Sequence, residues 1–317
     1  MAGSCSSTNR GISTAVVYVN KQIGQRSYRL TLQFEGVGSK AFAKAEPGQF
    51  AQLDLGDAPL PPVEAIPEDL VDASQRKVLL RRPFSFADVT AKQDTTFVDI
   101  LYCVVGPATL RMTRLSAGDS VSVIGPLGNG FCLPKDKKRT LLVAGGMGAG
   151  PLQHLAKVLT ADCPDIEVIA FAGAKTAEEL PFQKRLDEIS QQLGFSLAEF
   201  ARYGVKSLVA TDDGSAGFAG PVTDCFSEWL GRSGLAGKDI IIYSCGPEAM
   251  LAKVAEIAEK REIDCQVSME RMMACGIGLC QSCAVESKAD KSNETLYKLC
   301  CKDGPVFNAK EVFFRKK

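Results

Sequence analysis

The stretch RTLLVAGGMGAGPLQHLAKVL, residues 139–159, decides the fold of the middle of this chain. It opens with an apolar run suited to a buried strand and ends in the apolar spacing of a helix that starts near Pro151. A strand, a glycine turn and a helix in that order form a βα unit at which nucleotides bind, because bare backbone can approach a diphosphate at the positive end of the helix. The GxGxxG order itself is absent. The glycines of the turn are Gly145, Gly146, Gly148 and Gly150.

Two further segments repeat the change from apolar strand to helix, which predicts a doubly wound parallel sheet. They are IEVIAFAGAKTAEEL at 166–180 and DIIIYSCGPEAMLAKVAEIAEK at 239–260. Nucleotides bind at the carboxyl ends of such strands, and in the second segment the turn 245–247 directly follows the strand. No arginine cluster stands after the strand at 166–174 to meet a 2′-phosphate, so NADH is favoured over NADPH, although Lys175 leaves NADPH open.

The first third of the chain alternates short apolar stretches with glycine, proline and aspartate, which predicts an antiparallel barrel. Examples are TAVVYVN at 14–20, YRLTLQF at 28–34 and TFVDILYCVV at 96–105. The glycine-rich IGPLGNGF, 124–131, is interpreted as a turn that closes the barrel. Residues 58–80, rich in proline and acid, show no clear period and are interpreted as an inserted surface loop.

Two barrel segments carry features suited to an anion. LLRRPFSF, 79–86, places two arginines before a proline, and an arginine guanidinium offers a planar fork to a diphosphate. VVGPATLRM, 104–112, turns from a strand into a short helix whose first amides point outwards. Each feature alone is ordinary, since paired arginines are usually solvated and turns are common. Their conjunction about twenty residues apart favours a flavin diphosphate site.

The cysteines near the C-terminus are the most specific feature. CGIGLCQSC, 275–283, has the spacing of a plant-type two-iron cluster, and a fourth thiolate must come from farther along, where Cys300 and Cys301 lie. Gly276 and Gly278 free the backbone to wrap a cluster. A structural zinc site is the minor alternative, since zinc knuckles usually use CxxC. Disulfides are disfavoured because the N-terminus lacks the apolar core of a signal peptide, so a reducing cytoplasm is expected.

Composition narrows the function classes. A chain of 317 residues is expected to form two or three domains. Lys plus Arg equals Asp plus Glu at 37 each, so no net field attracts nucleic acid or an anionic membrane, and no run approaches a membrane span. The single histidine, His154, makes Ser/His or Cys/His catalysis improbable and is interpreted as a packed helix residue.

In the order barrel, nucleotide domain and cysteine loop, the chain resembles the ferredoxin reductase superfamily. RRPFS, GGMGAGPL, CGPEAML and above all MERMMACGIGLCQSCAVES with CKDGPVF resemble the electron-transfer subunits of NAD-dependent dihydroorotate dehydrogenases. The resemblance covers nearly the whole chain. It implies a multidomain β plus α/β protein with a Greek-key FAD barrel at 1–136, an NAD domain at 137–263 and a small [2Fe-2S] domain at 264–317.

The same resemblance implies the cofactor residues. Arg82 would hold the FAD diphosphate, and Pro83 and Phe84 would shape the strand beside the flavin. Ser85 would hydrogen-bond the flavin ring, and Gly106 and Thr109 would complete the diphosphate cradle. NAD would lie on Gly145, Gly146, Gly148, Gly150, Pro151, Cys245, Gly246 and Pro247. Residues 212–214 would either touch NAD or cap a turn. The cluster ligands would be Cys275, Cys280, Cys283 and Cys301, which leaves Cys300 as a spare thiol.

The family further implies a role in pyrimidine (UMP) biosynthesis. Electrons from an FMN-containing dihydroorotate dehydrogenase catalytic subunit would pass through the cluster and FAD to NAD, in a heterotetramer of two copies of each subunit. Met272, Met273 and Ile277 would contribute to the interface, although methionines there could equally pack in the core. The alternatives are a sister NADH-dependent reductase serving ferredoxin or a sulfur compound, and a zinc-stabilised nucleotide-binding regulator.

Overall fold

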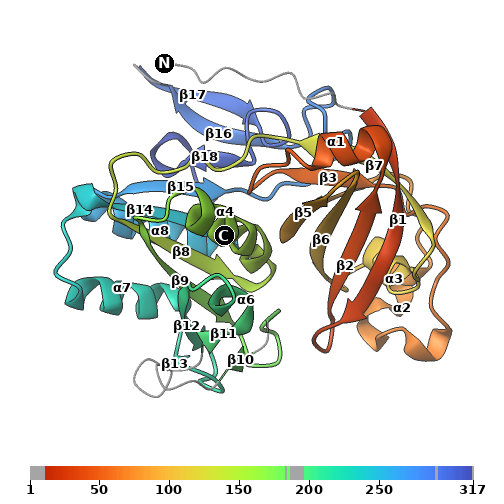
Figure 1. Cartoon of the computed structure of the whole chain (residues 1–317), viewed down its shortest axis with the longest axis horizontal. Coiled ribbons are helices and arrows are strands. Elements are labelled where there is room, and N and C mark those ends of the chain that lie inside the picture. The colour runs from red at the N-terminus through yellow and green to blue at the C-terminus, as the bar shows by residue number, and fades with distance from the viewer. Residues whose placement is uncertain (1–10, 183, 186–195, 290–291, 316–317) are drawn as a thin grey trace.

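The structure is a computed structural model that describes residues 11–182, 184–185, 196–289 and 292–315. Two seven-stranded sheets make up most of it, with a small hairpin above the second sheet (Figure 1). The first sheet, in red to yellow, is the predicted antiparallel barrel, and its order is β4-β3-β7-β1-β2-β6-β5. Its strands are β1 (Gly11–Gln22), β2 (Ser27–Phe34), β3 (Phe50–Leu53), β4 (Arg82–Ser85), β5 (Asp88–Lys92), β6 (Thr95–Cys103) and β7 (Ser120–Leu127).

The barrel forms because alternate residues of its strands are apolar and turn inwards. The predicted strands at 14–20, 28–34 and 96–105 are confirmed as β1, β2 and β6. The expected turn at 124–131 is later than predicted, because residues 124–127 still pair within β7 and the chain turns at Gly128, with φ +75°. Helix α1 (Gly36–Phe42) closes one end, and α3 (Pro107–Met112) follows β6.

The segment 58–80 is more ordered than the surface loop that its sequence predicts. It forms the short helices η1 (Val63–Ala65), η2 (Glu68–Leu70) and α2 (Val71–Ser74). Leu70 and Val78 are buried in the barrel's apolar cluster, and the Arg111 guanidinium donates to the Ala58 carbonyl. Sparse apolar residues without a period therefore still anchor this segment.

The second sheet is the predicted doubly wound sheet, with order β13-β12-β9-β8-β14-β15-β18; all its pairs are parallel except β15 with β18. Helix α4 covers one face, while α7 and α8 cover the other (Figure 1). The strands are β8 (Arg139–Gly145), β9 (Glu167–Ala174), β12 (Lys206–Thr211), β13 (Phe218–Ala219), β14 (Ile240–Cys245), β15 (Asp264–Ser268) and β18 (Val306–Asn308). The helices are η3 (Gly146–Gly148), α4 (Ala149–Asp162), α6 (Ala198–Ala201), α7 (Val222–Arg232), η4 (Gly237–Asp239) and α8 (Glu248–Lys260).

The C-terminal part combines the cysteine loop with the hairpin of β16 (Ala284–Ala289) and β17 (Ser292–Leu299), and a final turn η5 (Ala309–Glu311). A second small pair joins β10 (Lys184–Arg185) to β11 (Ser196–Leu197). The domain boundaries at 136/137 and 263/264 stay predictions. β15 and β18 both follow residue 263 and yet hydrogen-bond into the nucleotide-domain sheet.

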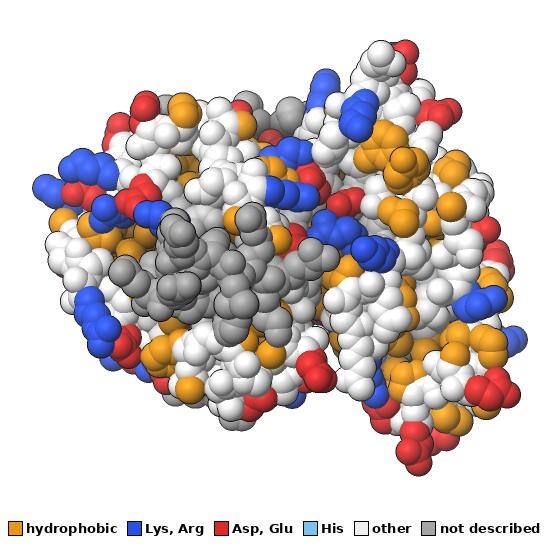
Figure 2. All heavy atoms as spheres, turned by 60° about the horizontal axis from the view of Figure 1, so that its bottom comes forward, with side chains coloured by type: hydrophobic (Ala, Val, Ile, Leu, Met, Phe, Trp, Pro, Cys, Tyr) orange, Lys and Arg blue, Asp and Glu red, His pale blue; other side chains and the backbone are white. Residues whose placement is uncertain are grey.

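The surface matches the balanced composition. In Figure 2, lysines and arginines are interspersed with aspartates and glutamates over the face drawn, on both lobes. Among the described residues, none of the helices has the length and apolar character needed to span a bilayer.

Candidate flavin, nicotinamide and iron–sulfur sites

The glycine turn after β8 packs directly against the turn after β14. A Cβ placed on Gly148 would stand 2.2 Å from the carbonyl oxygen of Cys245, and one on Gly145 would stand 2.7 Å from the Pro247 ring. Gly246 has φ +155°, a conformation that L side chains rarely adopt. The sequence therefore needs glycine at these positions, because two carboxyl ends of neighbouring parallel strands meet backbone to backbone. This is the edge of the sheet at which nucleotides bind.

The Cys245 side chain lies at this edge as a neutral thiol. Burial raises its pKa to about 12, against a smaller opposing effect of the Ser268 hydroxyl. A thiol that stays protonated at neutral pH is a poor nucleophile. Cys245 is therefore suited to line a nicotinamide site and not to react covalently.

The predicted flavin strand β4 lies at the edge of the barrel sheet, paired only with β3 among the described strands. The two arginines beside it are used differently. Arg81 is committed, since its guanidinium donates to the Ser122 carbonyl at 2.7 Å and pairs with Asp54 at 3.2 Å. Arg82 donates to the neighbouring carbonyls of Leu80 and Arg81 on the protein surface. The Arg82 fork can therefore be redirected to a diphosphate at little cost, which fits the predicted role.

The second predicted anion turn is built differently from its sequence expectation. The Thr109 hydroxyl accepts hydrogen bonds from the amides of Val105 and Gly106 at 2.9 and 3.2 Å. Thr109 thus caps α3 and satisfies the two amides that directly precede the helix. The amides of Ala108 and Thr109 lie in the first turn, where a helix has no internal acceptor for them. Contact of Gly106 and Thr109 with a diphosphate stays a prediction.

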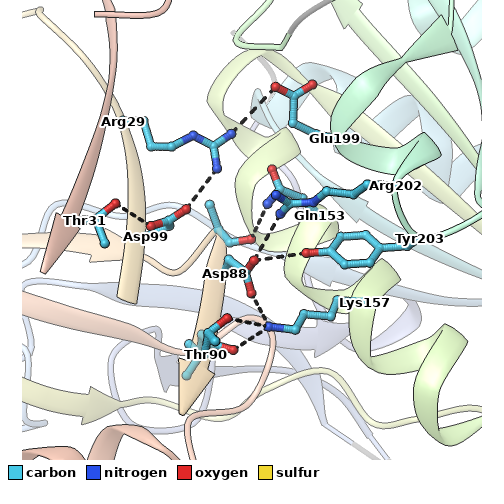
Figure 3. Close-up of polar contacts among 12 residues, drawn as sticks. Arg29, Thr31, Asp88, Thr90, Asp99, Gln153, Lys157, Glu199, Arg202 and Tyr203 are labelled. Carbon is cyan, nitrogen blue, oxygen red and sulfur yellow. Dashed lines mark hydrogen bonds and ion pairs between the residues drawn. The ribbon is translucent and has the colours of Figure 1, made fainter. Parts of the chain in front are cut away.

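A polar cluster fixes the barrel against the nucleotide domain, and no sequence motif pointed to it (Figure 3). Asp88 of β5 is its centre, accepting from Lys157 of α4 at 2.6 Å and from Arg202 and Tyr203 at 3.0 Å each. Desolvation raises the pKa of Asp88, but the hydrogen bonds from Lys157 and Tyr203, together with the positive charges of Lys157 and Arg202, outweigh it, so its pKa is lowered overall. An ionised Asp88 therefore holds the two lobes, and with them the predicted flavin and nicotinamide residues, in one relative orientation.

A second group extends this contact. Arg29 of β2 pairs with Asp99 at 3.0 Å and reaches Glu199 of α6 at 3.8 Å (Figure 3).

His154 of α4 is buried, as its interpretation as a packed residue requires. Burial lowers the His154 pKa to about 4, so the imidazole is neutral at physiological pH.

The cysteine loop holds the four predicted ligands as two pairs, each joined by a backbone amide that donates to a cysteine sulfur. The Cys280 amide donates to the Cys275 sulfur, and the Cys301 amide donates to the Cys283 sulfur, both at 3.4 Å. No three His, Cys, Asp or Glu side chains of the described ranges converge on a point that could hold a metal ion. A pairwise arrangement with amides aimed at sulfur fits a cluster bound by four thiolates.

The thiols of the loop differ sharply in acidity. Hydrogen bonds from the Ser282 hydroxyl and from backbone amides lower the pKa of the exposed Cys280 to about 6. Desolvation has the largest effect on Cys301 and the neighbouring Cys283 the next largest; both raise the pKa of Cys301, to about 12. Only thiolates bind iron, so the positive charge of the metal has to offset the burial of Cys301.

Cys300 has a different hydrogen-bond partner from the four predicted ligands. Its thiol donates to the Met269 carbonyl at 3.2 Å within the protein core. Burial raises the pKa of Cys300 to about 12. The neighbouring cysteines therefore differ in partner, and the role of Cys301 as the fourth ligand stays a prediction with geometric support.

Arg271 clamps the cysteine loop to the nucleotide domain, a role that the sequence did not reveal. Its guanidinium donates to both carboxylate oxygens of Glu248, at 2.8 and 2.9 Å, and Glu248 is the first residue of α8 after the turn 245–247. The Arg315 amide donates to the same carboxylate at 2.8 Å. A bidentate pair of this kind fixes orientation as well as distance. The only signal for it was the charged pair in MERMM.

The structure also bears on two further predictions, for the loop 212–214 and for the side chains expected to contact a partner. Asp213 caps its own turn, since its carboxylate accepts from the Ser215 amide at 3.0 Å and hydroxyl at 2.6 Å. Of the methionines beside the loop, Met272 is 89% exposed, whereas Met273 packs against the core. Ile277 is exposed with Met272. Exposure therefore favours Met272 and Ile277 over Met273 as partner contacts, and the interface itself stays a prediction.

Comparison with known proteins assigns the chain to a protein family. Residues 270–313 match the family model of the iron-sulfur cluster binding domain of dihydroorotate dehydrogenase B, and residues 142–256 match the oxidoreductase NAD-binding domain. A dihydroorotate dehydrogenase B (NAD(+)) electron transfer subunit from Caldanaerobacter subterraneus subsp. tengcongensis is 34% identical over 95% of this chain and 98% of its own length. The chain belongs to this family. The Geobacillus kaustophilus member of the dihydroorotate dehydrogenase B electron transfer subunits is 35% identical, over 95% of this chain and 98% of its own length.

Solved structures agree on the fold of this dihydroorotate dehydrogenase B family member. An NADH-dependent reduced ferredoxin-NADP oxidoreductase superposes with TM-score 0.71 at 24% identity, covering 95% of this chain and 90% of that one. A ferredoxin NADP+ reductase from Neisseria gonorrhoeae superposes with TM-score 0.55 at 14% identity, covering 79% and 91%. The predicted architecture, with a curled antiparallel sheet beside a parallel-containing sheet, is confirmed.

Proposed function

We propose that this chain is the electron-transfer subunit of an NAD-dependent dihydroorotate dehydrogenase in pyrimidine biosynthesis. It passes electrons from a catalytic partner subunit that holds FMN, through [2Fe-2S] and FAD, to NAD+. FAD can exchange two electrons with a nicotinamide and single electrons with an iron–sulfur cluster. Electron transfer between the cluster and NAD+ therefore needs FAD as the intermediate carrier. The protein's own residues bind, orient and shield these groups.

One observation carries the proposal: the cysteine loop packs against both nucleotide-binding units. Cys283 and Cys301 lie in the same buried apolar cluster as Phe50 of the barrel and Leu251 of α8. That cluster excludes water between the loop and the two lobes. The arrangement supports electron transfer between an iron–sulfur cluster bound by the loop and a flavin bound at β4.

The residue assignments complete the proposal. Arg82 would hold the FAD diphosphate and Ser85 the ring, while the turns at 145–150 and 245–247 would hold NAD. The Asp88 cluster would keep these two sites aligned. A reducing cytoplasm suits a loop that depends on free thiols, and every described cysteine is free.

The partner surface is proposed to surround the exposed ligand Cys280. Met272, Ile277 and Leu279, all within eight residues of Cys280 in the sequence, are 89%, 41% and 77% exposed, and exposed apolar side chains on one segment favour a protein interface. Two copies of each subunit would form the assembly. Replacing two of these residues, Met272→Glu with Leu279→Glu, should weaken complex formation by about 30-fold or more, because burying an interface charge costs at least about 2 kcal/mol.

Titration of the partner into labelled protein, by fluorescence anisotropy, measures this loss. Val63→Glu in η1 is the matched control, since Val63 is a 71% exposed apolar residue in the segment 58–80. The control should bind normally. Equal affinities of the double variant and the wild type would place the partner surface elsewhere.

The decisive test of function is NAD+ reduction by dihydroorotate, measured anaerobically with the complex purified from its source. Activity that is lost when the FMN subunit is removed, and returns when it is added back, is expected. A complex that is inert to dihydroorotate, but whose visible absorbance bleaches with NADH, would move the function to the sister reductases. A colourless protein containing zinc would refute electron transfer altogether.

A further inference from the structure

Gln52 of β3 is completely buried, yet neither polar atom of its side chain has a hydrogen-bond partner among the described residues. Buried amide groups are almost always satisfied, because water cannot reach an orphaned donor or acceptor. A strand position of this kind is normally apolar. The side chain therefore requires an explanation that packing does not provide.

The direction of the side chain follows from the alternation of the strand. Ala51 and Leu53 belong to the apolar cluster inside the barrel, so Gln52 faces the opposite side of the sheet. Phe50 shares that outer side and lies in the apolar cluster that contains Cys283. Gln52 thus extends from the barrel towards the cysteine loop.

The contact with the loop is close. A Cβ placed on Gly276 would stand 2.3 Å from Gln52 Nε2 and 2.7 Å from its Cγ, and Gly276 follows Cys275 directly. Across the sheet, Gln52 pairs in register with Pro83 of the flavin strand β4. The carboxamide therefore lies against the loop that carries the cysteines, on the strand next to the one proposed to carry the flavin.

We propose that Gln52 is a positioning residue for the iron–sulfur centre, donating a hydrogen bond from Nε2 to a sulfur atom of the loaded cysteine loop. The inference rests on the proposed function, since it assigns a partner that only the loaded protein supplies. Hydrogen bonds to cluster sulfurs stabilise the reduced, more negative form and so raise the reduction potential. Gln52 would set the cluster potential while holding the loop against the flavin strand.

Two variants in the purified complex test the donor. Gln52→Met keeps the length and volume of the side chain but removes the N–H, whereas Gln52→His keeps an N–H donor. Gln52→Met should retain iron and FAD while the cluster becomes about tenfold harder to reduce, a shift of about 59 mV for one electron. Gln52→His should shift the potential by less than half as much. A dithionite titration followed by electron paramagnetic resonance measures both.

Gln153→Met is the matched control. Gln153 is also completely buried and its Oε1 has no partner among the described residues, but its Nε2 donates to the Ala87 carbonyl at 3.0 Å, at the contact between α4 and the barrel. Loss of this buried amide should lower stability and leave the cluster potential unchanged. A purely structural role for Gln52 would give the same pattern.

The remaining outcomes also decide. A Gln52→Met complex with full iron, wild-type potential and an unchanged resonance spectrum overturns the proposal. If Gln52→Met cannot hold iron, retention of iron by Gln52→His supports the donor role, and loss of iron from both variants overturns it. Absence of iron or FAD from the wild type would instead refute the proposed function, so the two failures are distinguishable.

Discussion

A Cys301→Ser chain is expected to lose the iron–sulfur cluster, while a Cys300→Ser chain is expected to keep it. The Cys301 amide donates to the Cys283 sulfur, so residue 301 belongs to one of the two cysteine pairs. Serine is a poor replacement there, because its hydroxyl gives up a proton far less readily than a thiol and is a harder ligand than iron–sulfur chemistry favours. Iron and sulfide per chain, together with the visible spectrum, measure the loss.

The neighbouring substitution is a control of matched chemistry. The Cys300 thiol donates to the Met269 carbonyl, and a serine hydroxyl can make the same hydrogen bond. Iron content should therefore stay at the wild-type level in Cys300→Ser. The reverse pattern, with iron lost only from Cys300→Ser, would exchange the roles of the two residues.

The Cys301→Ser protein should lose the iron–sulfur cluster but keep FAD. FAD is proposed to bind on β4 of the barrel, whose strands do not depend on the cysteine loop for their hydrogen bonds. NADH should still bleach the flavin in this variant, whereas NAD+ reduction by dihydroorotate should fall below detection. Loss of FAD together with iron would show that the loop also supports the barrel.

Local sequence patterns predicted most of the fold, because its elements are locally encoded. The apolar run and glycines of 139–159 gave β8, η3 and α4, and alternation gave β1, β2 and β6. The segment 58–80 was predicted less well, since Leu70 and Val78 are anchored by contacts far away in the sequence. Periodicity carries no information about such isolated anchors.

The site was predicted only where a motif exists. The cysteine spacing identified the loop and the glycines identified the turn, because these residue types are required by chemistry or by close backbone contact. Asp88, Glu248 and Gln52 were not found, because each is defined by a partner more than 20 positions away along the chain. Single polar residues of this kind are indistinguishable from surface residues until the fold places them.

A Gly148→Ala chain is expected to bind and oxidise NADH poorly while keeping FAD and iron. The added Cβ would stand 2.2 Å from the Cys245 carbonyl oxygen and 2.4 Å from its carbon, both of them backbone atoms that no side-chain rotation can move. The turns after β8 and β14 would have to separate by about 1 Å to restore ordinary contact. Because misplacement of that size costs about 100-fold, kcat/KM for flavin reduction by NADH should fall by about that factor.

Stopped-flow bleaching of the flavin by NADH measures this rate, and dithionite should still reduce the flavin fully. Gly231→Ala in α7 is the control, because its Cβ would meet only the Arg261 guanidinium at 3.6 Å, an ordinary contact. Alanine also favours a helix over glycine by about 1 kcal/mol, so the control should be at least as stable as the wild type and react normally. If Gly148→Ala reacted with NADH at the wild-type rate, the close contact between these turns would not be part of the nicotinamide site, and the site would have to be sought along another strand end of the sheet.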